Sequence, residues 1–221
     1  MTDRALRIVK HHHACVELVA DGSRILVDPG SLGPAPGLDG VDAVLVTHEH
    51  PDHADAAVLS AALDRGIPVH GPASVRDTLG DALDDPGAPG WRTLSPGDRL
   101  DVAGLDVVVG GGPHAEMHPD VPGPENLSYL VAGTVLVSGD RHTPWDGQVP
   151  VLVTPVDAPW LRAVDLVRYV RQVAPRTVVG VHDGLLNDTG LSIADRVLAS
   201  LEREGVTRAV RPAVGEELTV P

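Results

Sequence analysis

The chain has 221 residues, of which 43% are hydrophobic, 22% are charged and only 2% are aromatic, and its formal net charge is −14. This length predicts one domain, residues 1–221, whose core is built mainly from Val, Leu, Ile and Ala. So acidic a chain is a poor partner for nucleic acid, because phosphates are bound by Lys and Arg.

The sequence also predicts where the protein works. Cys15 is the only cysteine, so the chain cannot form an internal disulfide, as is typical of reducing compartments. No targeting segment is visible, and no apolar run approaches the length that spans a bilayer. We therefore expect a cytoplasmic protein that acts on a small molecule, with no nucleic-acid or membrane partner.

Short Val-rich runs between turn residues predict strands along most of the chain. In chain order the expected strands cover residues 6–10, 14–20, 24–28, 42–48, 67–71, 91–95, 98–104, 105–111, 126–140 as a hairpin, 149–155, 176–183 and 217–220. Apolar residues at helical spacing predict helices at 54–65, 74–79, 161–173 and 192–204. This order favours an α/β fold in which two sheets pack together and helices cover the outside.

The strongest local feature is the run THEHPDH, residues 47–53, directly after an apolar strand. It places His48, His50, Asp52 and His53 where a strand opens into a loop, so that several side chains can converge. Imidazole nitrogens together with a carboxylate are typical ligands of a catalytic zinc site. A lone His in a loop is usually a solvated turn residue, but three with an Asp at this spacing favour a metal site.

This run resembles the T-H-x-H-x-D-H signature of the metallo-β-lactamase superfamily. The resemblance extends over residues 16–184 and implies a four-layer αββα sandwich of two mixed β-sheets. It also implies further ligands in loops: His114 in GGGPHAEMHPD, Asp140 in VLVSGDRH and His182 in VVGVHDG. The loop around His114 is closer to the branch that resembles ascorbate-phosphate lactonase and other metal-dependent hydrolases, and His118 in that loop is a rival ligand.

The family pattern implies a dinuclear site. Its ligand set is His48, His50 and His114 for one metal, Asp52, His53 and His182 for the second, and Asp140 as the bridge. His and carboxylate ligands suit Zn²⁺ first, with Mn²⁺, Fe²⁺ or Ni²⁺ as alternatives. The resemblance implies a hydrolase that uses a metal-bound hydroxide on a small ester, lactone, amide or phosphoester.

Several residues near these motifs have two interpretations. Asp52 and the bridging Asp belong to the expected catalytic centre, and His142 is expected there to contact substrate or donate a proton, although an exposed loop His would look the same. Arg141 is either a ligand for a substrate phosphate or carboxylate or a surface residue. Asp28 either holds a ligand His or closes a turn, and His13 is a candidate for the edge of the site.

Two other classes of function compete with hydrolysis. One is an iron-dependent oxidoreductase that resembles a sulfur dioxygenase; the di-iron reductase branch fits less well, because it carries Glu at the position of His50. The other is a non-catalytic metal-binding scaffold with the same fold. Substrate specificity is expected to reside in the loops at 30–40, 84–90 and 115–125, and a homo-oligomer is compatible with the sequence.

Overall fold

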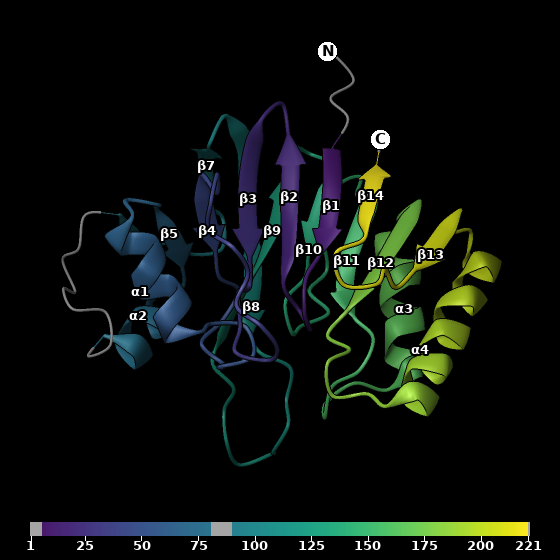
Figure 1. The fold of residues 1–221 in the computed structure, drawn as a ribbon. Helices are drawn as coiled ribbons and strands as arrows, with labels where there is room; N and C mark the ends of the chain where they lie inside the picture. The colour runs from purple at the N-terminus through teal and green to yellow at the C-terminus, as the bar shows by residue number, and fades with distance from the viewer. Residues whose placement is uncertain (1–5, 81–89, 221) are drawn as a thin grey trace.

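The computed structural model describes residues 6–80 and 90–220. Its strands form two seven-stranded sheets with helices on the outside (Figure 1). The first sheet has the spatial order β14 (Glu217–Val220), β1 (Leu6–Lys10), β2 (Val16–Ala20), β3 (Ser23–Val27), β4 (Ala43–Leu45), β5 (Val69–Gly71) and β6 (Trp91–Thr93). The second has the order β13 (Arg208–Val210), β12 (Thr177–Val181), β11 (Val151–Pro155), β10 (Val135–Val137), β9 (Glu125–Val131), β8 (Leu105–Pro113) and β7 (Arg99–Val102).

Both sheets are mixed. In the first, β14, β1, β2 and β3 pair antiparallel, and β3 to β6 pair parallel. In the second, β7 to β10 pair antiparallel, and β10 to β13 pair parallel. The predicted α/β sandwich of two mixed sheets is therefore confirmed.

Alternation along the strands sorts the apolar side chains into three cores, because successive residues of a strand point to opposite faces. On β3, Ile25 and Val27 enter the core between the sheets, whereas Leu26 joins the outer core against α1 (Ala56–Asp64). On β12, Val179 and Val181 enter the central core. Val178 points to the outer face of the second sheet, in the core that this sheet forms with α3 (Ala163–Val173) and α4 (Asp188–Ser200).

The C-terminal third differs from the prediction in two places. Helix α4 begins at Asp188, four residues before the predicted start, because the Asn187 side chain accepts a hydrogen bond from the Gly190 backbone and caps the first turn. It ends at Ser200, and a 3₁₀ turn, η1 (Leu201–Glu204), follows. Strand β13, only three residues long, was not predicted, since RAV has no periodic pattern of its own.

The loops that carry the sequence motifs gather at the lower end of the sandwich in Figure 1. The connection between β8 and β9 extends furthest from that end, and the short α2 (Ala73–Leu79) lies beside α1. Apart from Gly90, the loop expected at 84–90 lies outside the described residues.

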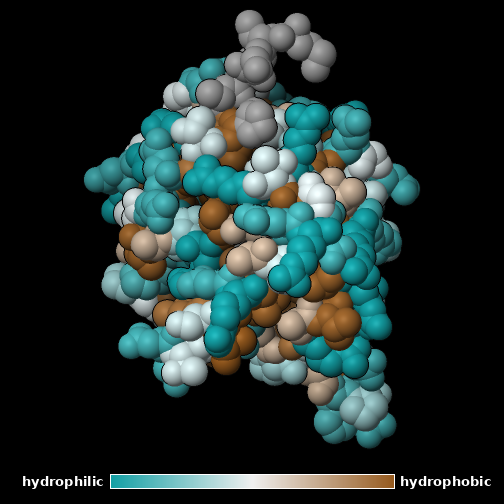
Figure 2. Space-filling model, turned by 90° about the vertical axis from the view of Figure 1, so that its right-hand side faces the viewer, coloured by the Kyte–Doolittle hydropathy of each residue, from teal (hydrophilic) through white to brown (hydrophobic). Residues whose placement is uncertain are grey.

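The surface is mainly hydrophilic where Figure 2 displays it. In that view, hydrophobic residues form patches divided by hydrophilic side chains. Within residues 6–80 and 90–220, every helix is too short or too polar to cross a membrane.

Candidate metal centre

All seven metal ligands expected from the sequence meet at this end of the sandwich. Four come from the loop between β4 and α1, and the other three follow strands of the second sheet: His48, His50, Asp52, His53, His114, Asp140 and His182. Most of these side chains are buried, while His50 and Asp52 are half-buried at the opening.

The first group of potential ligands consists of His48, His50 and His114, whose ligand atoms lie within 4.8 Å of one another. The Nε2 atom of His48 and the Nδ1 atom of His50 are 3.1 Å apart. Two nitrogens bound to one tetrahedral zinc at about 2.0–2.1 Å would be separated by roughly 3.3 Å. The arrangement therefore fits one metal ion with three imidazole ligands.

The second group contains Asp52, His53 and His182, joined by His13. The Oδ2 atom of Asp52 lies 3.3 Å from Nε2 of His182, 4.0 Å from Nε2 of His53 and 3.1 Å from Nε2 of His13. His13 is thus placed inside the site and not only at its edge.

Asp140 lies between the two groups. Its Oδ1 atom is 3.2 Å from Nε2 of His53, and its Oδ2 atom is 3.3 Å from Nε2 of His182 and 3.6 Å from Nε2 of His114. The backbone N–H of Asp140 donates to the side-chain oxygen of Asn126, which fixes the turn after β10. A carboxylate in this position can contact metals in both groups.

Asp28 orients two ligand histidines of the 47–53 motif. Its carboxylate accepts hydrogen bonds from Nδ1 of His53 at 2.9 Å, from the backbone N–H of Thr47 at 2.7 Å and from the Thr47 hydroxyl at 2.8 Å. Because the Thr47 hydroxyl gives its proton to Asp28, its oxygen accepts from Nδ1 of His48, 3.0 Å away. Of the two interpretations of Asp28, the structure supports the one in which it holds a ligand His.

Backbone carbonyls orient the other two buried histidines. Nδ1 of His114 donates to the carbonyl of Ala115 at 2.7 Å, and Nδ1 of His182 donates to the carbonyl of Asp157 at 2.6 Å. A neutral imidazole with its proton on Nδ1 has its lone pair on Nε2. In the neutral form of each ring, the lone pair therefore faces the interior of the site.

The atoms that face this interior are buried and unpartnered. Nε2 of His53, His114 and His182 and Oδ1 of Asp140 have no hydrogen-bond partner among the described residues. Buried polar atoms are almost always satisfied, so four unsatisfied ones aimed at one space require an explanation. Divalent metal ions would satisfy all four.

The electrostatics of the site suit metal ligands. Burial lowers the pKa of His48 well below its usual value, so this ring is neutral at neutral pH. Burial opposes ionisation of Asp140, but the charge of His53 and the close approach of the His114 and His182 rings hold the pKa of this carboxyl well below its usual range. Burial also opposes protonation of His182, yet contacts with Asp140 and Asp52 raise the pKa of this ring to about 9. A metal must displace that proton, which makes binding weaker at lower pH.

Trp160 and Tyr169, which contact Asp140 and His142 respectively, were not predicted from the sequence. The indole N–H of Trp160 donates to Oδ2 of Asp140 at 3.2 Å. His142 stacks on Tyr169, with ring centroids 4.4 Å apart, and meets Trp160 edge-on at 5.3 Å. His142 therefore contacts both Trp160 and Tyr169, and a catalytic role for His142 stays a prediction. The only signal for Trp160 was its position after a strand that ends at the same edge of the sheet.

The remaining candidates lie at the margin. His118 is exposed in the β8–β9 connection, where its ring accepts a hydrogen bond from the backbone of Asp120, so of the two rivals only His114 reaches the other ligands. The guanidinium of Arg141 donates to the carbonyl of Pro113.

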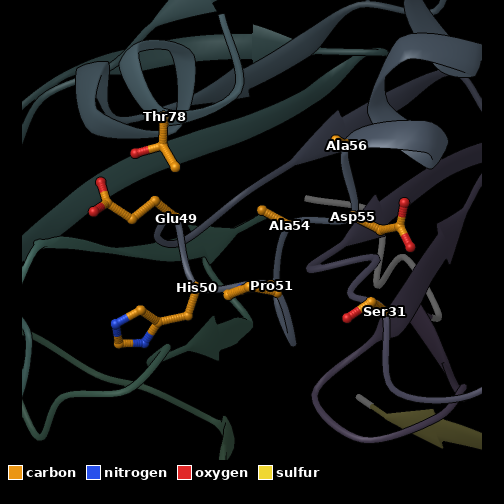
Figure 3. Close-up of a pocket in the computed structure, with 8 residues that line it drawn as sticks. All are labelled: Ser31, Glu49, His50, Pro51, Ala54, Asp55, Ala56 and Thr78. Carbon is orange, nitrogen blue, oxygen red and sulfur yellow. The ribbon is translucent and has the colours of Figure 1, made fainter. Parts of the chain in front are cut away.

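A cavity of about 470 Å³ opens beside His50 (Figure 3). Its lining comes from the motif loop, the first turn of α1, the β3–β4 loop and α2: Ser31, Glu49, His50, Pro51, Ala54, Asp55, Ala56 and Thr78. The lining combines apolar residues with polar ones, and Glu49 and Asp55 contribute carboxylates. Space for a small molecule therefore adjoins the first group of ligands.

Comparison with known proteins identifies the family. The family model described as a beta-lactamase superfamily domain matches residues 7–182, most of the chain. The chain belongs to this superfamily. Two related proteins are Protein Rv0786c of Mycobacterium tuberculosis, 34% identical over 82% of this chain and 85% of that protein, and a UPF0173 protein of Pyrococcus abyssi, 32% identical over 81% of this chain and 84% of that protein.

Solved structures of other proteins share the fold. The metallo hydrolase Igni18 of Ignicoccus hospitalis superposes with a TM-score of 0.72 at 17% identity, covering 98% of this chain and 99% of that chain. CmlA of Streptomyces venezuelae, a diiron β-hydroxylase, superposes with a TM-score of 0.72 at 19% identity, covering 98% of this chain and 54% of that chain. The fold thus serves metal-dependent hydrolysis in one of these proteins and diiron hydroxylation in the other.

Proposed function

We propose that this protein is a metal-dependent hydrolase with two divalent metal ions, zinc in the first instance. The observation that carries the proposal is the set of four buried, unpartnered ligand atoms on His53, His114, His182 and Asp140. A non-catalytic scaffold would have little reason to keep so many unsatisfied polar atoms next to an open cavity, because each one destabilises the fold unless a ligand occupies it.

Each side chain has a defined place in this proposal. His48, His50 and His114 would hold one metal, Asp52, His53 and His182 would hold the second, and Asp140 would be shared between them. When bound, two such ions would activate a water at neutral pH and polarise the carbonyl or phosphoryl oxygen under attack.

The protein itself supplies orientation and burial. Asp28 and the backbone carbonyls fix the rings of His53, His114 and His182 before any metal arrives, so little reorganisation is needed on binding. Trp160 donates to Asp140 from the side of the site that faces His114, and it limits how this carboxylate can rotate. Asp52 and His50, which are half-buried, mark the side from which substrate enters.

The substrate we propose is a small ester, lactone, amide or phosphoester. The cavity beside His50 would take the part of the substrate that does not react, and its lining, which includes the carboxylates of Glu49 and Asp55, disfavours an anionic group there. The net charge of −14 argues against a nucleic-acid substrate. The buried, unpaired thiol of Cys15 supports a cytoplasmic location.

The test is a hydrolysis screen with protein purified without a metal-affinity step. We expect activity on at least one class among lactones, aryl esters, amides and phosphodiesters. A chelator should abolish this activity, and zinc or manganese should restore it. His50→Ala and Asp52→Ala should each lower activity and metal content, while His12→Gln, a change in a ring that packs over Gly33, should not. Full activity and full metal content in both site variants would refute the assignment.

A second candidate is iron-dependent oxidation. It is supported by the structural likeness to the diiron β-hydroxylase, and His and carboxylate ligands also suit iron. Protein that retains iron and consumes oxygen in the presence of a substrate, but hydrolyses none of the panel, would favour this candidate over the hydrolase.

A further inference from the structure

His13 lies where a fourth ligand of the second metal would be expected. Its ring is buried, its Nε2 atom is 3.1 Å from Oδ2 of Asp52, and its centroid is 3.8 Å from that of His182. By distance alone, His13 belongs with Asp52, His53 and His182 as a potential metal ligand.

The other ring nitrogen of His13 argues against ligation. The backbone N–H of Gly184 donates to Nδ1 of His13 at 3.0 Å, so Nδ1 must carry a lone pair and cannot carry a proton. The proton of the ring is then on Nε2, where it points at the Asp52 carboxylate. A nitrogen that carries a proton has no lone pair to give to a metal.

This arrangement is the reverse of that of the ligand histidines. In His53, His114 and His182, Nδ1 faces an oxygen that can only accept, which leaves Nε2 free to bind a metal. In His13, Nδ1 faces an N–H group that can only donate. The protein therefore fixes opposite tautomers in rings that lie side by side.

The turn that carries His13 is held in place from several directions. His13 has a positive φ of 53°, and its carbonyl accepts hydrogen bonds from the backbone N–H of His182 at 2.9 Å and from Nζ of Lys10 at 2.8 Å. Lys10 is fully buried, and it also donates to the carbonyl of His11 and to Asp183. The backbone of His13 is thereby fixed, and a ring flip that turned Nδ1 away from Gly184 would cost the ring its hydrogen bonds with both Gly184 and Asp52.

We propose that His13 is a positioning residue for Asp52, which donates from Nε2 to the carboxylate and does not itself bind metal. The second metal would then be held by Asp52, His53, His182 and the shared Asp140. This inference rests on the proposed dinuclear site. Donors in this position orient ligand carboxylates and strengthen metal binding through them.

The direct test is a long-range ¹H–¹⁵N correlation spectrum of the wild-type protein, recorded without metal and with two equivalents of zinc. We expect His13 to show a protonated Nε2 and an unprotonated Nδ1 in both states. The rings of His53, His114 and His182 should show metal-shifted Nε2 signals when zinc is present. A metal-shifted Nε2 at His13 would overturn the proposal.

Variants provide an independent test through metal affinity, measured by competition with a chelator. Gln can present an N–H to Asp52 but is a poor zinc ligand, so His13→Gln should keep most of the affinity for both metals. His13→Ala should lower the affinity for one of the two metals by about 10–100-fold, and His182→Ala should abolish binding of that metal. His12→Gln should bind both metals as tightly as wild type. If His13→Gln lost the metal as completely as His182→Ala while retaining a wild-type circular dichroism spectrum, His13 would be a ligand.

Failure of this inference can be told apart from failure of the proposed function. A wild-type chain that binds no metal after zinc is supplied would refute the proposed function. The spectrum of the metal-free protein would still decide whether His13 donates to Asp52.

Discussion

The backbone N–H of His182 donates a hydrogen bond to the carbonyl of His13 across 2.9 Å, and both residues have positive φ, 63° and 53°. His13 lies in the turn between β1 and β2 of the first sheet, and His182 follows β12 of the second. This bond therefore ties the two sheets together where the candidate metal centre lies. Backbone conformations that are unfavourable for residues other than glycine often mark functional sites, and both occur here.

Asp28 is expected to control metal affinity without touching the metal. Its carboxylate accepts from His53 and twice from Thr47. Asp28→Asn places an amide N–H group against one of these donors, so we expect metal affinity to fall by about 10–100-fold and the free energy of unfolding to fall by about 1–3 kcal/mol. Chelator competition and urea unfolding measure the two effects. Asp42→Asn, at an exposed carboxylate that accepts a hydrogen bond from the Arg24 backbone, is the matched control. An equal loss of metal affinity in this variant would show that Asp28 has no special role at the site.

Gly30 is expected to admit no side chain. A Cβ atom at this position would lie 1.8 Å from the carbonyl oxygen of Asp52, which is backbone and cannot move aside alone. Gly30→Ala should therefore lower stability by at least about 2 kcal/mol and weaken metal binding by displacing the 47–53 loop. At Gly37 the same Cβ would meet nothing within 4 Å. Thermal unfolding of Gly30→Ala beside Gly37→Ala measures the difference, and similar melting temperatures would show that the loop is not packed as described.

The positions of these residues show what could be predicted from the sequence. Strands with alternating or continuous apolar residues, such as Ile25 to Val27, were predictable because burial on one or both faces sets the pattern. The ligands of the 47–53 motif were predictable because they are neighbours in the chain. His13 and Gly184 meet only after the two sheets have packed together, so no local pattern records their hydrogen bond.

The role of His142 can be tested by replacing its ring. The sequence predicts a catalytic role for it; in the structure its ring is stacked on Tyr169, and burial lowers its pKa to about 4. From this geometry we expect His142→Phe to retain two metals and to change kcat by less than about tenfold. Removing a general acid or base typically lowers the rate by about 10²–10⁴-fold. A loss in that range, with metal content unchanged, would establish the catalytic role.

His70 is expected to contribute to acid sensitivity. Burial, with a smaller effect from the charge of Arg92, lowers the pKa of this ring to about 4, compared with 6.5 for an ordinary His. Between pH 6.5 and 4 the unfolded chain binds the proton and the folded chain does not, so stability falls as the pH falls through this window. The contribution is about 1–3 kcal/mol by pH 4.

The matching experiment is urea unfolding of metal-free wild type and His70→Leu at pH 7 and pH 4.5. Metal-free protein is used because acid also removes metal from its ligands. The variant should lose less stability than wild type between the two pH values. Equal losses would show that His70 is protonated in the folded state at pH 4.5.

The two groups of ligands joined by Asp140 are predicted to hold two metal ions. The most direct measurement is elemental analysis of metal per chain, on protein purified without a metal-affinity step and dialysed after addition of zinc. We predict two ions per chain for wild type and fewer for Asp140→Ala, with His12→Gln equal to wild type. Wild-type protein that retained no metal under these conditions would show that these residues do not form a metal site.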